Sequence, residues 1–248
     1  MSRENGAELC AGPAEGLPPW TVATTAQRIL AVDFSIEELI NLRQQATAAL
    51  RVRPVVRHVK TGAIIPTWAY GRLSDADMEA IDKATLEFAR RLKPSDSEAQ
   101  LPLILPQSFR TVTSRRGRTT LGLATEGAAK ARIIVELIEV DRGTPSGRLA
   151  EVCGLLAIAC KGVFVRLQPG REAIAPVREV RPHGLSLDAG DIPGADSYVA
   201  STLLEIGEQA KGRSPLLVAQ GLSSDGFFAV AEVAGFTHVS LRCEVGSS

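Results

Sequence analysis

Aromatic residues and long apolar runs are both scarce in this sequence. Phe, Trp and Tyr make up only 4% of the 248 residues, so the core must rest on Leu, Ile, Val and Ala. No run approaches the ~18 apolar residues of a transmembrane helix. The N-terminus lacks the basic start and apolar stretch of a secretory signal. We therefore expect a cytoplasmic protein that makes no membrane contact.

A charge excess and paired cysteines are also absent. The 28 basic and 28 acidic residues cancel and form no basic stripe, so the charge pattern gives no support for nucleic-acid binding. The cysteines are Cys10, Cys153, Cys160 and Cys243. None belongs to a CxxC pair, which argues against zinc. Cys153 and Cys160 lie on an apolar helical stretch and are expected to be buried thiols.

The chain is predicted to consist of a flexible tail, residues 1–30, and one domain, residues 31–245. Gly, Pro, Glu and Ala dominate the tail, which shows no periodicity. The first predicted helix covers residues 35–50, because Ser35 and Glu38 form the pattern of a capping box. Its apolar face would carry Ile36, Leu39, Ile40 and Leu50.

A hairpin and a second helix are predicted next. Val55–Val59 is rich in β-formers, Lys60-Thr61-Gly62 is a turn, and Ala63–Ile65 resumes an extended run. The helix that follows has apolar residues at alternating spacings of three and four, namely Met78, Ile81, Thr85, Phe88 and Leu92.

From residue 101 onward, short apolar runs alternate with helical stretches. The predicted strands are Leu101–Leu105, Ile133–Leu137, Val163–Leu167, Leu185–Leu187, Leu216–Ala219 and His238–Leu241. The predicted helices lie near 108–115, 121–130, 146–160, 171–180, 195–211 and 224–234. This alternation is typical of a parallel sheet with helical crossovers. With the hairpin, eight strands suit a closed α/β barrel, and an open doubly wound sheet is the alternative.

An ordered set of segments resembles the EAL-domain family of cyclic di-GMP phosphodiesterases. RPVVRHVKTGAIIPTWAYGR at 53–72 resembles the opening of such a domain, with a QPIV-type strand, a TG turn and the Glu-Ala-Leu strand. LPLILPQS at 101–108 resembles the strand ending in Asn-Leu-Ser, and IIVELIE at 133–139 resembles the Glu-x-Thr-Glu strand. HGLSLDAGDI at 183–192 and LLVAQGLSS at 216–224 resemble the Lys-x-Asp and Ala-Glu-Gly-Val-Glu strands.

The resemblance implies a TIM-like (β/α)8 barrel whose first strand is antiparallel to the second. Active members hydrolyse cyclic di-GMP with Mg²⁺ or Mn²⁺ at the C-terminal ends of the strands. Hard cations require several oxygen ligands. The family supplies carboxylates and one Asn for them, and a Lys beside the attacking water.

Most of these functional positions carry other residues in this chain. By the resemblance, Trp68 stands for the Glu of the name motif, Pro106 for the Asn, and Arg166 and Leu167 for two aspartates. By the same resemblance, Ser186 stands for the Lys and Gln220 stands for the Glu of the Ala-Glu-Gly motif. Ser240 stands for the last Gln of the family pattern. The surviving residues are Arg72, Glu136, Glu139 and Asp188, which are the candidate ligand-binding residues. We therefore predict no catalytic residue, no metal and no cofactor.

Arg166 is the most informative of these replacements. Family order places its strand beside the strand of Glu136, so its guanidinium would lie where a cation would sit. We expect Arg166 to form an ion pair with Glu136 and thereby replace the metal's charge. The competing interpretation places Arg166 in solvent at the strand end.

Other charged groups receive simpler interpretations. The three histidines, His58, His183 and His238, fall on different strands and are expected to be structural rather than a metal triad. Arg115, Arg116 and Arg118 could contact phosphates, but a solvated loop is the simpler interpretation.

Three functions remain open at this point. The first is a catalytically inactive EAL-like protein that acts in bacterial signalling through an unidentified protein partner, with a homodimer implied by resemblance only. The alternative is a receptor that binds cyclic di-GMP without cleaving it, through Arg72 and stacking on Trp68. The third is an enzyme with a different reaction, for which Ser186, Asp188 and Gln220 are the polar set at the strand ends.

Overall fold

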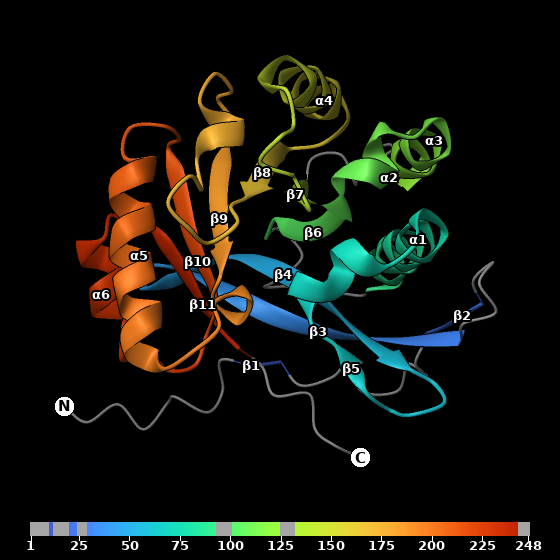
Figure 1. Ribbon diagram of the computed structural model, residues 1–248, viewed down its shortest axis with the longest axis horizontal. Helices are drawn as coiled ribbons and strands as arrows, with labels where there is room; N and C mark the ends of the chain where they lie inside the picture. Colours follow the sequence, from blue (N-terminus) through green and yellow to red (C-terminus); the bar gives the residue numbers. More distant parts are fainter. Residues whose placement is uncertain (1–9, 12–19, 24–28, 93–100, 125–131, 243–248) are drawn as a thin grey trace.

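A closed barrel of eight strands forms the centre of the molecule (Figure 1). The computed structural model describes residues 10–11, 20–23, 29–92, 101–124 and 132–242. In order around the barrel, the strands are β3 (Ile29–Asn41), β11 (His238–Leu241), β10 (Leu216–Leu222), β9 (Gly184–Asp188), β8 (Gly162–Arg166), β7 (Ile133–Ile138), β6 (Leu103–Ser108) and β4 (Ala46–His58). Pairing of β4 with β3 closes the ring. The predicted closed barrel is confirmed.

Strand β3 is the antiparallel member of the barrel. It runs antiparallel to both of its neighbours, β4 and β11, whereas the other adjacent barrel strands are parallel to each other. A tight turn can join antiparallel strands, while parallel strands need a longer crossover. The predicted antiparallel first strand is therefore present, although it lies earlier in the chain than the sequence suggested.

The helix predicted over residues 35–50 is wrong, because this segment contains parts of the long β3–β4 hairpin and its turn. Gln45 supplies the turn with a positive φ of 53°. Glu38, expected to cap a helix, instead accepts a hydrogen bond from Thr47 across the hairpin at 2.8 Å. Glu37, on the same strand, has a fully buried side chain. Tertiary pairing therefore overrides the local helical pattern.

Parts of the predicted tail also belong to the sheet. Strands β1 (Cys10–Ala11) and β2 (Trp20–Ala23) pair antiparallel with β3. The Trp20 ring lies 4.4 Å below the guanidinium of Arg91. The hairpin expected near residue 60 is confirmed, since β4 pairs with β5 (Ile64–Ile65). The remaining tail residues, 1–9, 12–19 and 24–28, lie outside the described part of the chain.

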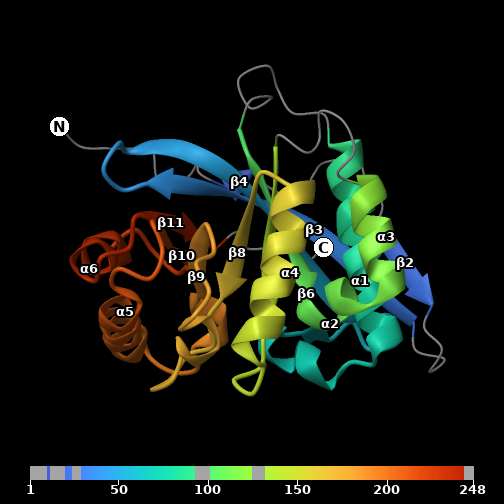
Figure 2. The same ribbon diagram turned by 90° about the horizontal axis from the view of Figure 1, so that it is seen from above.

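Helices surround the outside of the barrel (Figure 2). They are α1 (Asp75–Arg91), α2 (Phe109–Thr113), α3 (Arg115–Ala124), α4 (Ser146–Ala159), α5 (Asp196–Ala210) and α6 (Phe227–Val233). Short 3-10 turns are η1 (Thr67–Arg72), η3 (Ala175–Val177) and η4 (Ala189–Asp191). The helix predicted over 171–180 is reduced to η3, because Pro176 lacks the N–H that a longer helix would use. No helix of the described residues is long and apolar enough to cross a bilayer.

The barrel strands are buried on both faces. Their outward side chains join the large core beneath the helices. Their inward side chains form a second, smaller cluster of Leu39, Ala49, Ile104, Ile134, Phe164 and Val218, which fills the lower lumen. Because side chains alternate along a strand, residues two positions further along point into the lumen one layer higher. That layer carries the charges described below.

Cys153 and Cys160, on and next to α4, were both predicted to be buried, and this holds for one of them. Cys160 is buried and its thiol donates to the carbonyl of Leu156, whereas Cys153 is only partly covered. Burial raises the pKa of the Cys153 thiol to about 11, so it stays protonated near neutral pH.

We expect Gly207 to be required for the packing of α5 against α6. A Cβ at this position would collide with the backbone carbonyl of Ala234. Gly207→Ala should therefore lower the free energy of unfolding by about 1–3 kcal/mol, as overpacking does, in a urea titration. The matched control is Gly154→Ala on α4, where nothing lies within 4 Å of the added methyl. That variant should gain about 0.5–1 kcal/mol, and equal effects of the two would contradict the assigned contact.

Candidate functional site

A network of buried charges lies in the lumen, directly above the apolar cluster. Arg51 follows Ala49 by two positions on β4, and Glu136 follows Ile134 on β7. Arg51 donates to Glu37 at 2.9 Å and to Asp188 at 2.8 Å. The three carboxylates, those of Glu37, Glu136 and Asp188, are fully buried, and Arg51 is 1% exposed. The β3–β4 hairpin and the distant strand β9 are thus tied together inside the barrel.

Arg166 and Glu136 form the ion pair that the sequence predicted. Nη2 of Arg166 lies 2.7 Å from Oε2 of Glu136. The hydroxyl of Ser186 donates to the other carboxylate oxygen at 2.5 Å. Nη1 of Arg166 also lies 3.8 Å from carboxylate oxygens of both Asp188 and Asp191. The side chain is buried, so its predicted alternative position in solvent is wrong.

The network is close to electrically balanced. Three arginines, Arg51, Arg53 and Arg166, pair with four carboxylates, which are those of Glu37, Glu136, Asp188 and Asp191. Burial alone would raise the pKa of Glu136, but the charges of Arg166 and Arg51 outweigh it and hold that pKa below normal. The pKa of Asp188 is lowered for the same reason, with Arg51 as its largest partner. Glu136 and Asp188 therefore remain ionised although they are buried.

The donor set does not fit a divalent cation. Mg²⁺ requires several oxygens at about 2.1 Å in near-octahedral geometry. Here both oxygens of Glu136 already accept hydrogen bonds, and Asp188 is bonded to Arg51 and to the backbone N–H of Gly190. Within the described residues, no group of three or more His, Cys, Asp or Glu could hold a metal ion. The space between the carboxylates is taken by guanidinium groups.

Two of the four candidate ligand-binding residues lie outside this network. Glu139 sits at the end of β7 with a φ of 59°, and accepts hydrogen bonds from Ser108 at 2.6 Å and Arg110 at 3.2 Å. A positive φ is strained for a side chain other than glycine. Arg72 lies at the rim, with its guanidinium 5.5 Å from the ring centre of Trp68. The structure thus brings Glu136 and Asp188 together and leaves Arg72 apart from them.

Trp68 does not lie on a barrel strand, which corrects the position assigned to it. It belongs to η1, and 60% of its surface is exposed. The strand that follows the antiparallel strand is β4, and it directs Arg51 into the lumen at the level of Glu136. Arg51 and Glu37 were missed from the sequence because a buried charged residue resembles an exposed one. The alternation Arg-Val-Arg at 51–53 was the available sign of a strand with one charged face.

The other substituted positions divide between the lumen and the outer core. Pro106 pairs with Glu136 in register, and Ser186 and Ser240 bond to Glu136 and Glu37. Gln220 is fully buried, and neither the oxygen nor the nitrogen of its side-chain amide has a hydrogen-bond partner among the described residues. Leu167 instead packs in the outer core.

The residues of the alternative catalytic set make other contacts in the structure. Ser186 donates to Glu136, Asp188 is held by Arg51, and Gln220 contacts neither through a hydrogen bond. A nucleophile needs a base within hydrogen-bond reach. His238, at the opposite end of its strand from the network, is bonded to Asn41 and Thr237. The third function therefore receives no support from the geometry.

A pocket of about 410 Å³ opens at the mouth of the barrel. It is formed by η1, by the segments after β7, β8 and β9, and by Tyr198 on α5. Arg166 forms part of its wall, so the pocket borders the charge network. Carboxylates of Glu139, Asp141 and Asp191 and the ring of Trp68 also line it.

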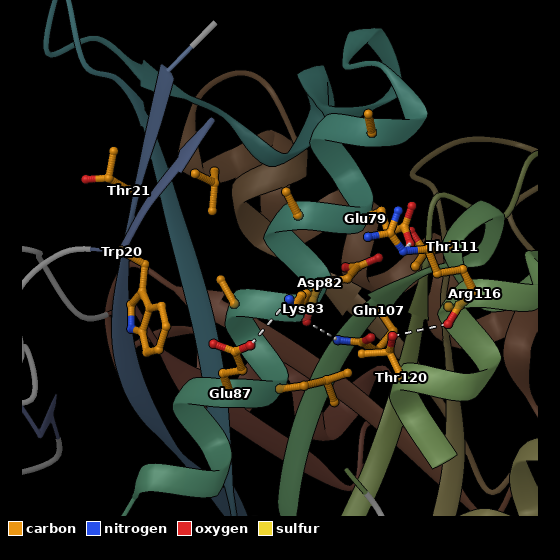
Figure 3. Close-up of a pocket in the computed structure, with 16 residues that line it drawn as sticks. Trp20, Thr21, Glu79, Asp82, Lys83, Glu87, Gln107, Thr111, Arg116 and Thr120 are labelled. Atoms are coloured by element: carbon orange, nitrogen blue, oxygen red, sulfur yellow. Dashed lines mark hydrogen bonds and ion pairs between the residues drawn. The ribbon is translucent and has the colours of Figure 1, made fainter. Parts of the chain in front are cut away.

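A second pocket, of about 530 Å³, lies outside the barrel beside α1 (Figure 3). Its buried carboxylate is that of Asp82, which is 2% exposed and accepts a hydrogen bond from the backbone N–H of Ser108 at 3.1 Å. Burial raises the pKa of Asp82 to about 7, although the hydrogen bond from the backbone N–H of Ser108 opposes the shift. The rim charges are already paired, Lys83 with Glu87 and Arg116 with Glu79.

We expect Arg166→Ala to destabilise the protein by about 3–5 kcal/mol in a urea titration, because it leaves buried carboxylates uncompensated. In this variant Glu136, Asp188 and Asp191 would surround the space left by the guanidinium. Mn²⁺ should then restore about 1–3 kcal/mol when present in ten- to hundredfold excess over its Kd. The control is Arg148→Ala, an exposed arginine on α4, which should change stability by less than about 0.5 kcal/mol. An equal Mn²⁺ effect on the wild-type protein would contradict this assignment.

The elevated pKa of Asp82 predicts a pH-dependent stability. An unfolded Asp ionises near pH 4, whereas folded Asp82 keeps its proton until about pH 7. The unfolded state therefore binds fewer protons in this window, and stability falls by up to about 1.4 kcal/mol per pH unit. Relative to Asp82→Asn, the wild-type protein should thus lose stability between pH 5 and about 7 in urea titrations. The exposed control Asp225→Asn should follow the wild-type curve, and parallel curves for Asp82→Asn and wild type would refute the prediction.

Comparison with solved structures finds the same barrel in EAL-domain proteins. Bacillus subtilis YkuI, a protein with an EAL domain solved with cyclic di-GMP and calcium, matches with a TM-score of 0.61 at 15% identity, covering 83% of this chain and 53% of that chain. Klebsiella pneumoniae BlrP1, in a manganese and cyclic di-GMP complex, matches with a TM-score of 0.60 at 12% identity. The match covers 90% of this chain and 57% of that chain. The EAL enzyme Bd1971, with cAMP and cyclic di-GMP bound, matches with a TM-score of 0.60 at 13% identity. The match covers 86% of this chain and 60% of that chain.

The sequence comparisons find no counterpart. No family model matches the sequence, and no curated protein matches it. The chain also spans less than two thirds of the length of the three structures, between 53% and 60%. At 12–15% identity the likeness concerns the fold. On the agreement of strand order, antiparallel first strand and structural similarity, the chain has the barrel fold of EAL domains.

Proposed function

We propose that this chain is a catalytically inactive EAL-like barrel that acts in bacterial signalling by binding another protein. The observation that carries the proposal is the position of Arg166, whose guanidinium is 2.7 Å from Glu136 inside the lumen. Metal-assisted hydrolysis needs a divalent ion and an activated water at the strand ends. In this barrel a fixed positive charge stands between the carboxylates that such an ion would need.

The intact barrel and its outer core support a role that depends on the fold. The strands remain closed into a barrel, and the outer core under the helices is continuous. The replaced residues are concentrated in the lumen, at Pro106, Arg166, Ser186, Gln220 and Ser240. A protein that needs only its surface can replace such residues, provided that the new buried charges are balanced. A protein partner, including a second copy of the chain, would use that surface.

A receptor that binds cyclic di-GMP without cleaving it is the second candidate. The similar structures of YkuI, BlrP1 and Bd1971 were solved with this dinucleotide. Arg72 and Trp68 lie together at the rim and could contact a phosphate and stack on a base. Against this, the lining of the mouth pocket contains three carboxylates, which repel a dinucleotide with two phosphate charges.

We expect no hydrolysis when the full chain is incubated with cyclic di-GMP and millimolar Mn²⁺, as followed by chromatography of the products. An active EAL phosphodiesterase serves as the positive control. Isothermal titration calorimetry with cyclic di-GMP at micromolar protein should give no heat of binding. Turnover with Mn²⁺ would refute the proposal, while binding without turnover would establish the receptor instead.

A further inference from the structure

The mouth pocket has the composition of a site for a positively charged group. Its volume of about 410 Å³ lies in the range of small-ligand sites. The charged residues of its lining are Glu139, Asp141, Asp191 and Arg166. The single positive charge, Arg166, is paired with Glu136 in the lumen behind the pocket. The pocket therefore presents an excess of negative charge to whatever enters it.

The carboxylates differ in how far they are already engaged. Glu139 is held by Ser108 and Arg110. Asp141 is exposed, and its side chain makes no ion pair within the described residues. Asp191 is largely covered, its nearest cation among the described residues is 3.8 Å away, and its buried Oδ1 has no hydrogen-bond partner among them. Asp141 is thus open to a donor that approaches from the pocket, whereas Asp191 is weakly paired and would have to turn its carboxylate to accept one.

Two exposed aromatic rings flank these carboxylates. Trp68 is 60% exposed and Tyr198 is 53% exposed, and both line the pocket. Aromatic faces attract ammonium and guanidinium groups, with energies of about 0.5–1 kcal/mol at exposed sites. The Trp68 ring already has one such neighbour, since Arg72 lies 5.5 Å from its centre. Arg72 is not part of the described lining, so the pocket itself is not filled by it.

From this combination, we infer that the mouth pocket binds a lysine or arginine side chain of a protein partner. The aromatic rings would contact the long aliphatic stem and the cationic head, and Asp141 and Asp191 would accept its hydrogen bonds. Charge complementarity selects this occupant over an anionic dinucleotide. The inference rests on the proposed function, because it assigns the protein partner to a particular surface and a particular chemistry.

The test uses Trp68 as a fluorescent reporter in the full chain. Trp20→Phe removes the other tryptophan, which lies on β2. The probe is the capped tripeptide acetyl-Gly-Arg-Gly-amide. We expect a saturable change of Trp68 fluorescence at millimolar probe, weakened by added salt because the partners are exposed charges.

Variants of the pocket then locate the binding site. In the Trp20→Phe background, Asp141→Asn and Tyr198→Ala should each raise the apparent Kd by about two- to fivefold, from the loss of a partly screened charge or of one aromatic face. Glu151→Gln, which removes an exposed carboxylate on α4, is the matched control and should leave the Kd unchanged.

Several outcomes would overturn the inference. These are the absence of any saturable change, an equal response to acetyl-Gly-Glu-Gly-amide, or an equal loss of affinity in Glu151→Gln. Displacement of the arginine probe by micromolar cyclic di-GMP would assign the pocket to the dinucleotide. These readouts are separate from the hydrolysis assay. The pocket can therefore fail to bind the arginine probe while the protein shows no hydrolysis, or bind the probe while the protein does hydrolyse cyclic di-GMP.

Discussion

The mutual compensation of buried charges in the lumen is the constraint on which the rest of this barrel depends. Carboxylates from β3, β7 and β9 and guanidinium groups from β4 and β8 meet at buried positions in the lumen. Each ion alone would cost several kcal/mol to bury. Together they compensate one another's charge, so the five strands must keep their register for the network to exist.

The closing hairpin shows how this constraint is met. β3 contributes Glu37 and β4 contributes Arg51, and the two strands pair over their whole length. Their antiparallel register places Glu37 directly opposite Arg51. Closure of the barrel and neutralisation of its lumen therefore use the same two strands. A slip of one residue would turn both side chains away from the lumen.

The proposed function follows from the kind of positive charge in the lumen, which comes from arginine side chains. Arginines in the lumen supply fixed positive charge in place of an exchangeable cation, which favours a stable barrel over a metal-dependent one. The mouth above them keeps unneutralised carboxylates and exposed rings. A surface of this kind suits a basic protein segment better than a phosphodiester.

The sequence by itself determined the order of the strands from β6 to β11, because a short apolar run marks each of them. The resemblance to EAL domains predicted the pairing of Arg166 with Glu136, since the family order places the two residues on neighbouring strands. Only the tertiary structure decided that residues 35–50 contribute to a hairpin, that Arg51 rather than Trp68 faces the lumen, and that Trp68 and Tyr198 flank one pocket. The physical reason is that a charged side chain facing the lumen has the same local pattern as one facing solvent. Its partners lie far away in the chain, since Asp188 is 137 residues from Arg51 and Ser240 is 203 residues from Glu37.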